Sequence, residues 1–289
     1  YNKATKEYLL FLEEHPNQLQ TISNRIMAFP SEKNINKEIT NILSNSSLKI
    51  AKFLLADFQF KQKNYKQGYK VLKDNQASPQ ILLDYAKDLA AINELMMAEE
   101  VLTDIIDANI NEVIITQSIF ELAKIFESKM IITSINLPLS GFYPHNTFFT
   151  SPYLPIKEEA SVGISSAMEI YDSLRVSKKN AQAAYRLAEI QFRILGDLDG
   201  AHYLYQEAYK HGNSQGLRKD AGVGMINIQI AKGNLEKAIF ICTELQKTYP
   251  QILEYKIKEA QIQFYKGQFD IVDNSLRSII ETLPLDHPI

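Results

Sequence analysis

The 289-residue sequence has no tryptophan, a single cysteine and no unbroken apolar stretch of the length that crosses a membrane. Because a disulfide needs two cysteines, one cysteine excludes an intrachain disulfide and a cysteine-based metal cage. The net charge of −3 lacks the basic excess that nucleic-acid binding requires. We therefore expect a soluble chain with no membrane span and no nucleic-acid partner. A single cysteine fits the cytoplasm, the periplasm or the exterior, so the compartment stays open.

Residues with catalytic or metal-binding chemistry are scattered along the chain. No two of the five histidines stand four residues apart, the spacing that places two imidazoles on one helix face. Gly222-Val223-Gly224 lies inside a helix-like segment, so it is predicted to allow close helix packing rather than to bind phosphate. No serine or cysteine has the sequence context of a nucleophile. The sequence predicts no enzyme, no metal and no cofactor, and the one alternative left open is a site near His145 or Tyr143.

Three glycine turns recur at nearly constant spacing in the last third of the chain. Gly233 follows Gly196 by 37 residues, and Gly267 follows Gly233 by 34 residues. After each turn, a small residue is followed by a larger one four positions on and an apolar one three positions further, so all three share one helix face. Such a stripe is buried only by a neighbouring unit, which indicates repeated helical hairpins. The sets are Ala201, Tyr205 and Ala208; Ala238, Cys242 and Leu245; and Val272, Leu276 and Ile279.

This period and this order of residues resemble the tetratricopeptide repeat family. The resemblance implies an all-α fold, a right-handed superhelical solenoid of antiparallel helix pairs that spans residues 1–289 as a single domain. Upstream, Lys63-Asn64-Tyr65 and Asn93-Glu94-Leu95 occupy the turn positions without the glycine. Helical hairpins are expected at about 47–74, 78–107, 180–211, 215–248 and 251–282.

One helix pair of the predicted repeat is interrupted by a long insertion. A first helix is expected at 111–128, but its second-helix stripe of Ala167, Tyr171 and Leu174 arrives only after residues 129–160. The four prolines of the insertion prevent a long helix, and its aromatic residues are too many for a flexible linker. We therefore expect the insertion to lie ordered against the solenoid or a second subunit. Its aromatic residues are Phe142, Tyr143, Phe148, Phe149 and Tyr153.

The leading interpretation is a non-enzymatic scaffold that binds a partner protein or peptide through the concave face and the 129–160 insertion. In the tetratricopeptide family the first helices line this face, and in chaperone-binding members a lysine with an asparagine four residues later clamps a peptide carboxylate. The corresponding positions here carry no such pair. The alternative for the aromatic candidates is packing within or between hairpins. The partner-binding candidates are Phe53, Phe60, Lys87, Lys124, Arg186, Arg193, Asn227 and Phe264, with Tyr143, Phe148, Phe149 and Tyr153 in the insertion.

The first helix has the residue order of a second helix, with Ala4, Tyr8 and Phe11 at the stripe positions. The chain is thus expected to start in mid-repeat, as a processed or excised form or as part of a longer protein or assembly. Apolar side chains at both ends make Tyr8, Phe11, Ile279 and Ile280 candidates for end contacts. The alternative function is therefore a structural subunit that self-assembles head-to-tail into a filament or tube.

Overall fold

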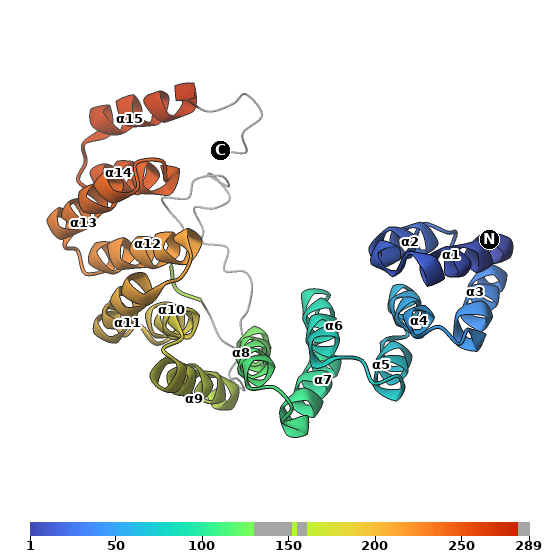
Figure 1. Ribbon diagram of the computed structural model, residues 1–289. Coiled ribbons are helices and arrows are strands. Elements are labelled where there is room, and N and C mark those ends of the chain that lie inside the picture. Colours follow the sequence, from blue (N-terminus) through green and yellow to red (C-terminus); the bar gives the residue numbers. More distant parts are fainter. Residues whose placement is uncertain (130–151, 155–160, 283–289) are drawn as a thin grey trace. The chain divides into compact units, whose positions relative to one another are not determined.

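A computed structural model describes residues 1–129, 152–154 and 161–282 of the chain (Figure 1). These residues form 15 α-helices, a short 3-10 turn and a π-helical turn, and they contain no β-strand. The prediction of an all-α fold of successive antiparallel helix pairs is confirmed. The chain divides into two compact units, Tyr1–Ile125 (unit 1) and Phe126–Ile289 (unit 2). Continuity of the repeat as one superhelix stays a prediction.

Unit 1 begins with three helices that cover one another. Leu9 and Leu12 of the first helix are buried, and this helix packs on the second and third helices. These supply buried Ile26 and Leu43, so the first helix packs on helices that follow it in the chain, and a start in mid-repeat stays a prediction. Two hairpins follow, and the last helix crosses the boundary into unit 2. The helices are α1 (Asn2–Glu14), α2 (Leu19–Met27), α3 (Lys33–Asn45), α4 (Lys49–Lys61), α5 (Tyr65–Asp74), α6 (Pro79–Ala91), α7 (Leu95–Ala108) and α8 (Glu112–Ser128).

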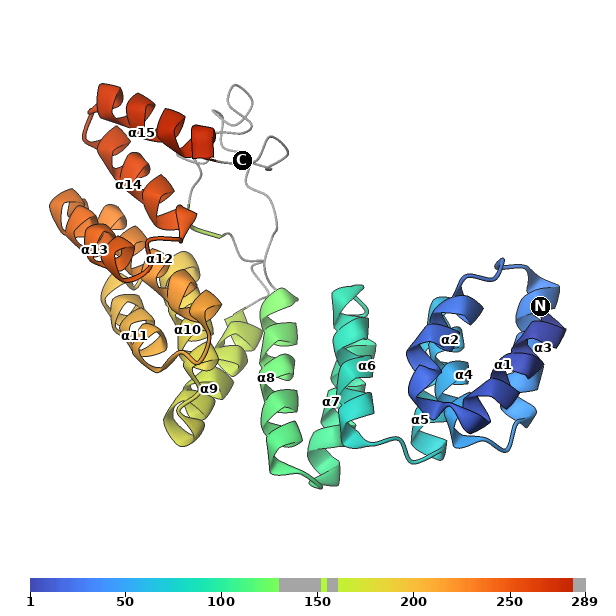
Figure 2. The same ribbon diagram turned by 45° about the horizontal axis from the view of Figure 1, so that its top comes forward.

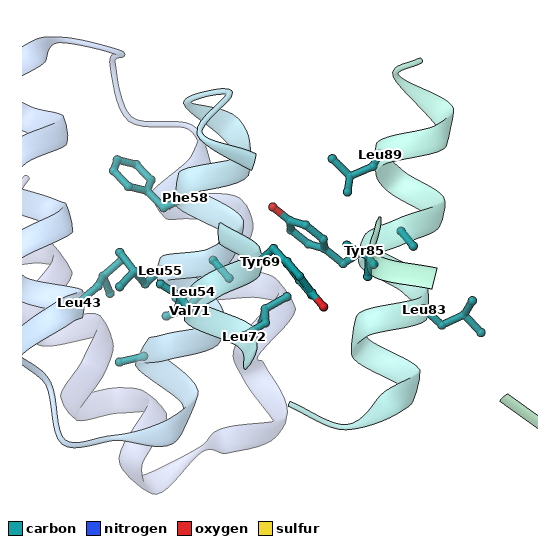
Figure 3. Packing of buried hydrophobic residues seen from close by; sticks show 14 of the residues in the cluster. Leu43, Leu54, Leu55, Phe58, Tyr69, Val71, Leu72, Leu83, Tyr85 and Leu89 are labelled. Carbon is teal, nitrogen blue, oxygen red and sulfur yellow. The ribbon is translucent and has the colours of Figure 1, made fainter. Parts of the chain in front are cut away.

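The core of unit 1 passes from one hairpin to the next. Phe58 of α4 and both Leu83 and Leu89 of α6 are fully buried. Between α5 and α6, the rings of Tyr69 and Tyr85 face each other with their centroids 6.5 Å apart (Figure 3). Each hairpin therefore completes its core with side chains of the next hairpin, as stacked repeats do.

Unit 2 stacks its helix pairs in sequence order, and Figure 2 shows the same pairs from a second direction. Ala201 and Tyr205, and likewise Ala238 and Cys242, are fully buried at the stripe positions expected for second helices. The helical register read from the sequence is therefore confirmed in these two hairpins. The helices are α9 (Ser161–Lys178), α10 (Ala181–Ile190), α11 (Leu198–His211), α12 (Gln215–Ala231), α13 (Leu235–Thr248), α14 (Leu253–Tyr265) and α15 (Phe269–Thr282).

Helices α8 and α9 flank the insertion. The first ends at Ser128 and the second begins at Ser161. The stripe of α9 is buried as expected, with Ala167 and Tyr171 fully enclosed and Leu174 nearly so. That α8 and α9 are the two helices of one repeat stays a prediction.

The turns inside the hairpins share one backbone conformation. Gly196, Gly233 and Gly267 have φ values of 70°, 72° and 75°. Lys63 and Asn93 stand at the equivalent positions of unit 1 with φ values of 62° and 65°. This left-handed conformation places Cβ close to the backbone and costs roughly 1–2 kcal/mol in residues other than glycine. The upstream turns predicted from residues without glycine are thus present, and their backbone is strained at Lys63 and Asn93.

We expect Lys63→Gly to raise the free energy of unfolding of unit 1 by roughly 0.5–1 kcal/mol, because relief of the left-handed strain exceeds the entropy that glycine loses. Lys63 is exposed, so little packing is lost. The matched change in the opposite direction, Gly233→Ala, should lower the free energy of unfolding of unit 2 by about 1 kcal/mol. Urea unfolding of the three chains measures both effects. Equal stability of all three would contradict a shared left-handed turn.

Candidate functional site

A groove in unit 2 is lined by one face of each first helix. It encloses about 540 Å³ and is formed by α10, α12, α14 and the π-helical turn η5 (Gln191–Leu195) that ends α10. The lining side chains recur three or four residues apart on each helix, which is the spacing of a single helix face. They include Tyr185 and Glu189 on α10, Val223 and Asn227 on α12, and Lys258 and Gln261 on α14.

The wall of the groove is fixed from behind by Tyr205 of α11. A Cβ at Gly224 would lie 2.5 Å from a carbon of the Tyr205 ring, so only glycine allows α12 to approach this closely. The Tyr205 hydroxyl donates a hydrogen bond to Glu189 Oε1 at 2.5 Å. Burial, and then the negative charge of Glu189, raise the pKa of Tyr205, so the phenol keeps its proton and stays a donor. Glu189 is therefore held in place by the core.

Glu189 in turn orients Arg193. The second carboxylate oxygen, Oε2, lies 3.2 Å from Arg193 Nη1. Arg193 Nε then donates a hydrogen bond of 3.0 Å to the carbonyl oxygen of Pro152. Buried Tyr205 thus fixes Glu189, and Glu189 in turn orients the Arg193 guanidinium at the edge of the groove. There the guanidinium binds a segment that lies 41 residues earlier in the chain.

Residues 152–154 dock at this edge and appear as the short coloured stretch beside α12 in Figure 1. The amide of Leu154 donates to the carbonyl of Arg193 at 2.8 Å. Between the two bonded positions, the ring of Tyr153 meets Phe192 edge to face, with centroids 5.9 Å apart. A carbonyl and the amide two residues later point to the same side in an extended chain. Arg193 therefore forms backbone hydrogen bonds with the segment on both sides of Tyr153.

The π-helical turn explains why the carbonyl of Arg193 accepts this bond. The amides of Gly196 and Asp197 both donate to the carbonyl of Gln191. Arg193 lies in the last turn of the helix, where carbonyls lack an intrahelical donor. Its carbonyl is therefore open to an amide from another segment. Single π turns of this kind are frequent at functional sites.

The remainder of the groove is polar on the side of α14. Lys258 Nζ donates to Gln261 Oε1 at 2.7 Å, and Gln261 Nε2 donates to the Tyr265 hydroxyl at 2.9 Å. Burial lowers the pKa of Lys258 below its ordinary value. The groove thus combines an ammonium, side-chain amides and phenols with the apolar surface of Val223 and Phe192.

Three residues predicted from the sequence meet in this groove. Arg193, Asn227 and Tyr153 all line it, although they come from the π turn, α12 and the insertion. Tyr143, Phe148 and Phe149 lie outside the described residues. Their part in binding stays a prediction.

Arg186 of α10 was also predicted to bind a partner protein, but its side chain contacts Glu127 and does not line the groove. Its Nη2 lies 2.6 Å from Glu127 Oε2, and its Nε donates to the same oxygen at 3.1 Å. The buried hydroxyl of Tyr171 donates to this oxygen as well, at 3.1 Å. The Glu127 side chain is only 7% exposed. Arg186 thus joins α8, α9 and α10 across the insertion, and the groove-facing positions of α10 are Tyr185 and Glu189 instead.

The remaining partner-binding candidates are not among the residues that line this groove. The ring of Phe60 packs inside unit 1, with centroids 5.1 Å from Tyr65 and 5.4 Å from Tyr85. Phe53 is partly buried against the same core, and Lys124 pairs with Glu121 at 2.7 Å. Lys87 is half-buried on α6, and Phe264 packs edge to face on Phe269 at 5.5 Å.

The end-contact candidates divide into engaged and exposed side chains. Tyr8 stacks on Phe29 at 6.4 Å, and Ile279 is buried. Phe11 is 44% exposed on α1 and Ile280 is 62% exposed on α15. Among the four candidates, only these two are therefore exposed enough to meet another chain.

Several groove residues were missed by the sequence reasoning. These are Tyr185, Glu189, Phe192, Lys258 and Tyr265. The 37-residue interval from Val223 and Asn227 leads to Arg186 and Ile190, one residue away from the lining positions Tyr185 and Glu189, so the repeat spacing could not find them. Phe192 carried no spacing signal either, because the π turn changes the register at the end of α10.

The other described parts of the molecule contain weaker candidates for a functional site than the groove. Unit 1 has a cavity of about 670 Å³ between α1 and α3 and another of about 460 Å³ beside α7, neither holding a described chain segment. Among the residues that the structure describes, no three His, Cys, Asp or Glu side chains gather as metal ligands would. None of the described helices is both long and apolar enough to span a bilayer. The groove in unit 2 is therefore the candidate site.

Comparison with protein families gives no match, and no protein of curated function matches the chain. Solved structures resemble it at low sequence identity. The MamA protein is 15% identical with a TM-score of 0.47, over 72% of this chain and 98% of that one. The TPR protein TTC0263 of Thermus thermophilus is 13% identical with a TM-score of 0.45, over 75% and 100%. PilF of Pseudomonas aeruginosa is 15% identical with a TM-score of 0.43, over 90% and 97%.

These similarities concern the backbone, and the assignment rests on the chain's own geometry. Its helices pair in sequence order, the second helices bury a small residue and a larger one four positions later, and the hairpin turns share a left-handed residue. Together these features make the chain an all-α repeat of antiparallel helix pairs with a tetratricopeptide-like fold.

Proposed function

We propose that the protein is a non-enzymatic scaffold and that the groove of unit 2 binds an extended segment of a partner protein. The observation that carries this proposal is the docking of residues 152–154, which the groove holds through two backbone positions and one ring. A surface that accepts three residues of its own chain in this way offers the same hydrogen-bonding groups to another chain.

The chemistry of the groove suits a peptide. Asn227 and Gln261 carry amides that both donate and accept, so they pair with a peptide backbone whatever its sequence. Val223 and Phe192 provide apolar surface, and Lys258 adds a positive charge. All five stand on helices or a helix end, so the groove is formed before a partner arrives and less entropy is lost on binding.

The test begins with linear peptides selected from a random library on the immobilised full chain. Their affinity is then measured for the wild type and for the double variant Asn227→Ala, Gln261→Ala. We expect the double variant to bind at least about tenfold more weakly, because each lost amide removes hydrogen bonds worth roughly 1 kcal/mol.

The matched control changes exposed side chains of the helices that do not line the groove. Tyr203 of α11 and Phe240 of α13 are 61% and 64% exposed, so Tyr203→Ala with Phe240→Ala should leave the affinity unchanged. Circular dichroism checks the fold of each variant. Failure to select any peptide, or selection of peptides that depend on Tyr203 and Phe240, would rule out the groove as the binding surface.

The finer parts of the proposal concern the insertion and the path of the repeat. We propose that residues 129–160 take part in partner binding together with the concave face, because Tyr153 of this insertion already lies in the groove. We also propose that the helix pairs continue as a right-handed superhelix, as the family resemblance implies.

Head-to-tail assembly into a filament or tube is the second candidate function. It is favoured by the exposed Leu10 and Phe11 on α1 and by Ile271 and Ile280 on α15. Open ends related by a contact that does not close generate filaments. Sedimentation velocity over a range of protein concentrations tests it, and a concentration-independent monomer would exclude it.

A further inference from the structure

The groove of unit 2 is already occupied at one edge by the protein itself. We infer that residues 152–154 are a resident ligand of this groove and that a partner binds by displacing them with an extended segment centred on an aromatic residue. This inference rests on the proposed function and adds what the groove recognises and how its access is controlled.

Three contacts define what the groove reads. Arg193 Nε donates a hydrogen bond to the carbonyl of Pro152, and the carbonyl of Arg193 accepts one from the amide of Leu154. Both contacts involve the peptide backbone of the segment, so they do not depend on its side chains. The ring of Tyr153 meets Phe192 between these two bonds. The chemistry recognised is therefore a backbone carbonyl, an aromatic side chain and a backbone amide on three successive residues.

The binding platform does not depend on the segment. Phe192 stands on the π turn of unit 2 and is 2% exposed with Tyr153 against it, and Glu189 pairs with Arg193 from the groove side. Glu189 is itself held by Tyr205 of the core. Removal of residues 152–154 from the edge therefore leaves both the ring surface and the guanidinium in position for another segment.

The segment is only partly covered by the groove. Tyr153 is 43% exposed, so much of its ring faces solvent although it touches Phe192. Exchange for a partner segment would replace these contacts one for one. A tethered segment competes at an effective concentration of about millimolar. The apparent affinity for a free peptide is reduced by the fraction of molecules whose groove is open.

The test uses a labelled heptapeptide with the sequence of residues 150–156, Thr-Ser-Pro-Tyr-Leu-Pro-Ile, and a second peptide with alanine in place of the tyrosine. Fluorescence anisotropy measures binding to the full chain. Tyr153→Ala removes the resident ring, so we expect this variant to bind the tyrosine peptide at least about tenfold more tightly than the wild type. The alanine peptide should bind at least about tenfold more weakly than the tyrosine peptide.

Two further variants locate the binding. Addition of Arg193→Ala to Tyr153→Ala should remove most of the gained affinity, because the guanidinium no longer meets the peptide carbonyl. Tyr203→Ala is the matched control, since it deletes an exposed tyrosine on α11 outside the groove, and it should bind the peptide as the wild type does. Circular dichroism establishes that all variants are folded.

Amide exchange of Leu154 gives an independent readout. Its hydrogen bond to Arg193 should slow exchange in the wild type, and saturating tyrosine peptide should accelerate it as the segment leaves. Equal peptide affinity of the wild type and Tyr153→Ala, no binding to either, or a gain equally large in Tyr203→Ala would each overturn the inference. Library-selected peptides that still require Asn227 and Gln261 would leave the proposed function intact in those cases, so the two failures are distinguishable.

Discussion

Replacement of Arg186 by alanine is expected to lower the free energy of unfolding of unit 2 by about 3 kcal/mol. The reason is that the Glu127 carboxylate, only 7% exposed, loses the guanidinium that compensates its charge. Breaking a buried ion pair from one side costs about 3–5 kcal/mol, and Arg186 lies at the low end because its side chain is 33% exposed. Urea unfolding of the full chain, followed by circular dichroism, measures the loss.

Two companion variants separate a buried charge from general damage. Glu127→Gln with Arg186→Ala leaves no charge uncompensated, so this double variant should be more stable than Arg186→Ala alone. Arg277→Ala removes a pair with Asp273 whose side chains are 71% and 61% exposed, and it should change stability by less than about 1 kcal/mol. A loss below about 1 kcal/mol for Arg186→Ala, or no recovery in the double variant, would show that the cluster does not hold α8 to α9 and α10.

Ala238→Asp is expected to lower the free energy of unfolding by several kcal/mol, on the order of 3–5 kcal/mol, because it places an unpaired carboxylate in a closed core. Ala238 is fully buried on α13, in the same cluster as Cys242 of this helix and Tyr255 and Ile262 of α14. Each repeat completes its core with its neighbour, so the damage should extend to α14. Urea unfolding measures the loss, and hydrogen exchange locates it.

The control for Ala238→Asp introduces the same residue one position earlier. Lys237 is exposed on the same helix, so Lys237→Asp should change stability by about 0.5 kcal/mol or less. The pair therefore tests the helical register directly. Similar losses for both variants would mean that the stripe of α13 faces another direction.

Substitutions in the groove and substitutions in the cluster around Glu127 are expected to affect different properties of the protein. Arg193 lies at a partly exposed edge, so its replacement should affect binding more than stability. Arg186 lies seven residues earlier, yet its partner is a buried carboxylate on α8. The two arginines looked alike as groove candidates, and only their partners separate a binding role from a stabilising one.

The hairpins could be predicted from the sequence because their signals are local. A small residue, a larger one four positions later and a glycine turn determine where a helix begins and which face it buries, as Ala201, Tyr205 and Gly196 illustrate. The upstream turns at Lys63 and Asn93 followed from the same spacing, even without glycine. Buried stripes and turn positions follow from intervals of a few residues, so they can be read directly from the sequence.

The groove was only partly predictable for a related reason. Asn227 was found because it repeats the helical interval from Val223, and Arg193 because it continues the first helix of its hairpin. Tyr185 and Glu189 were missed because the lining face of α10 differs by one residue from the predicted one. A shift of one residue turns a helix by about 100°, which moves a side chain from the groove to the core.

What the sequence by itself determined is the class of protein: an all-α repeat whose second helices bury regular stripes, with no signal for catalysis. Only the tertiary structure decided which distant groups meet. Glu127 joins Tyr171 and Arg186 across separations of 44 and 59 residues, and Arg193 meets Pro152 across 41. Such contacts depend on how helices stack and where a π turn leaves a carbonyl free. Helical periodicity repeats every few residues, so it carries no information on pairings that far apart.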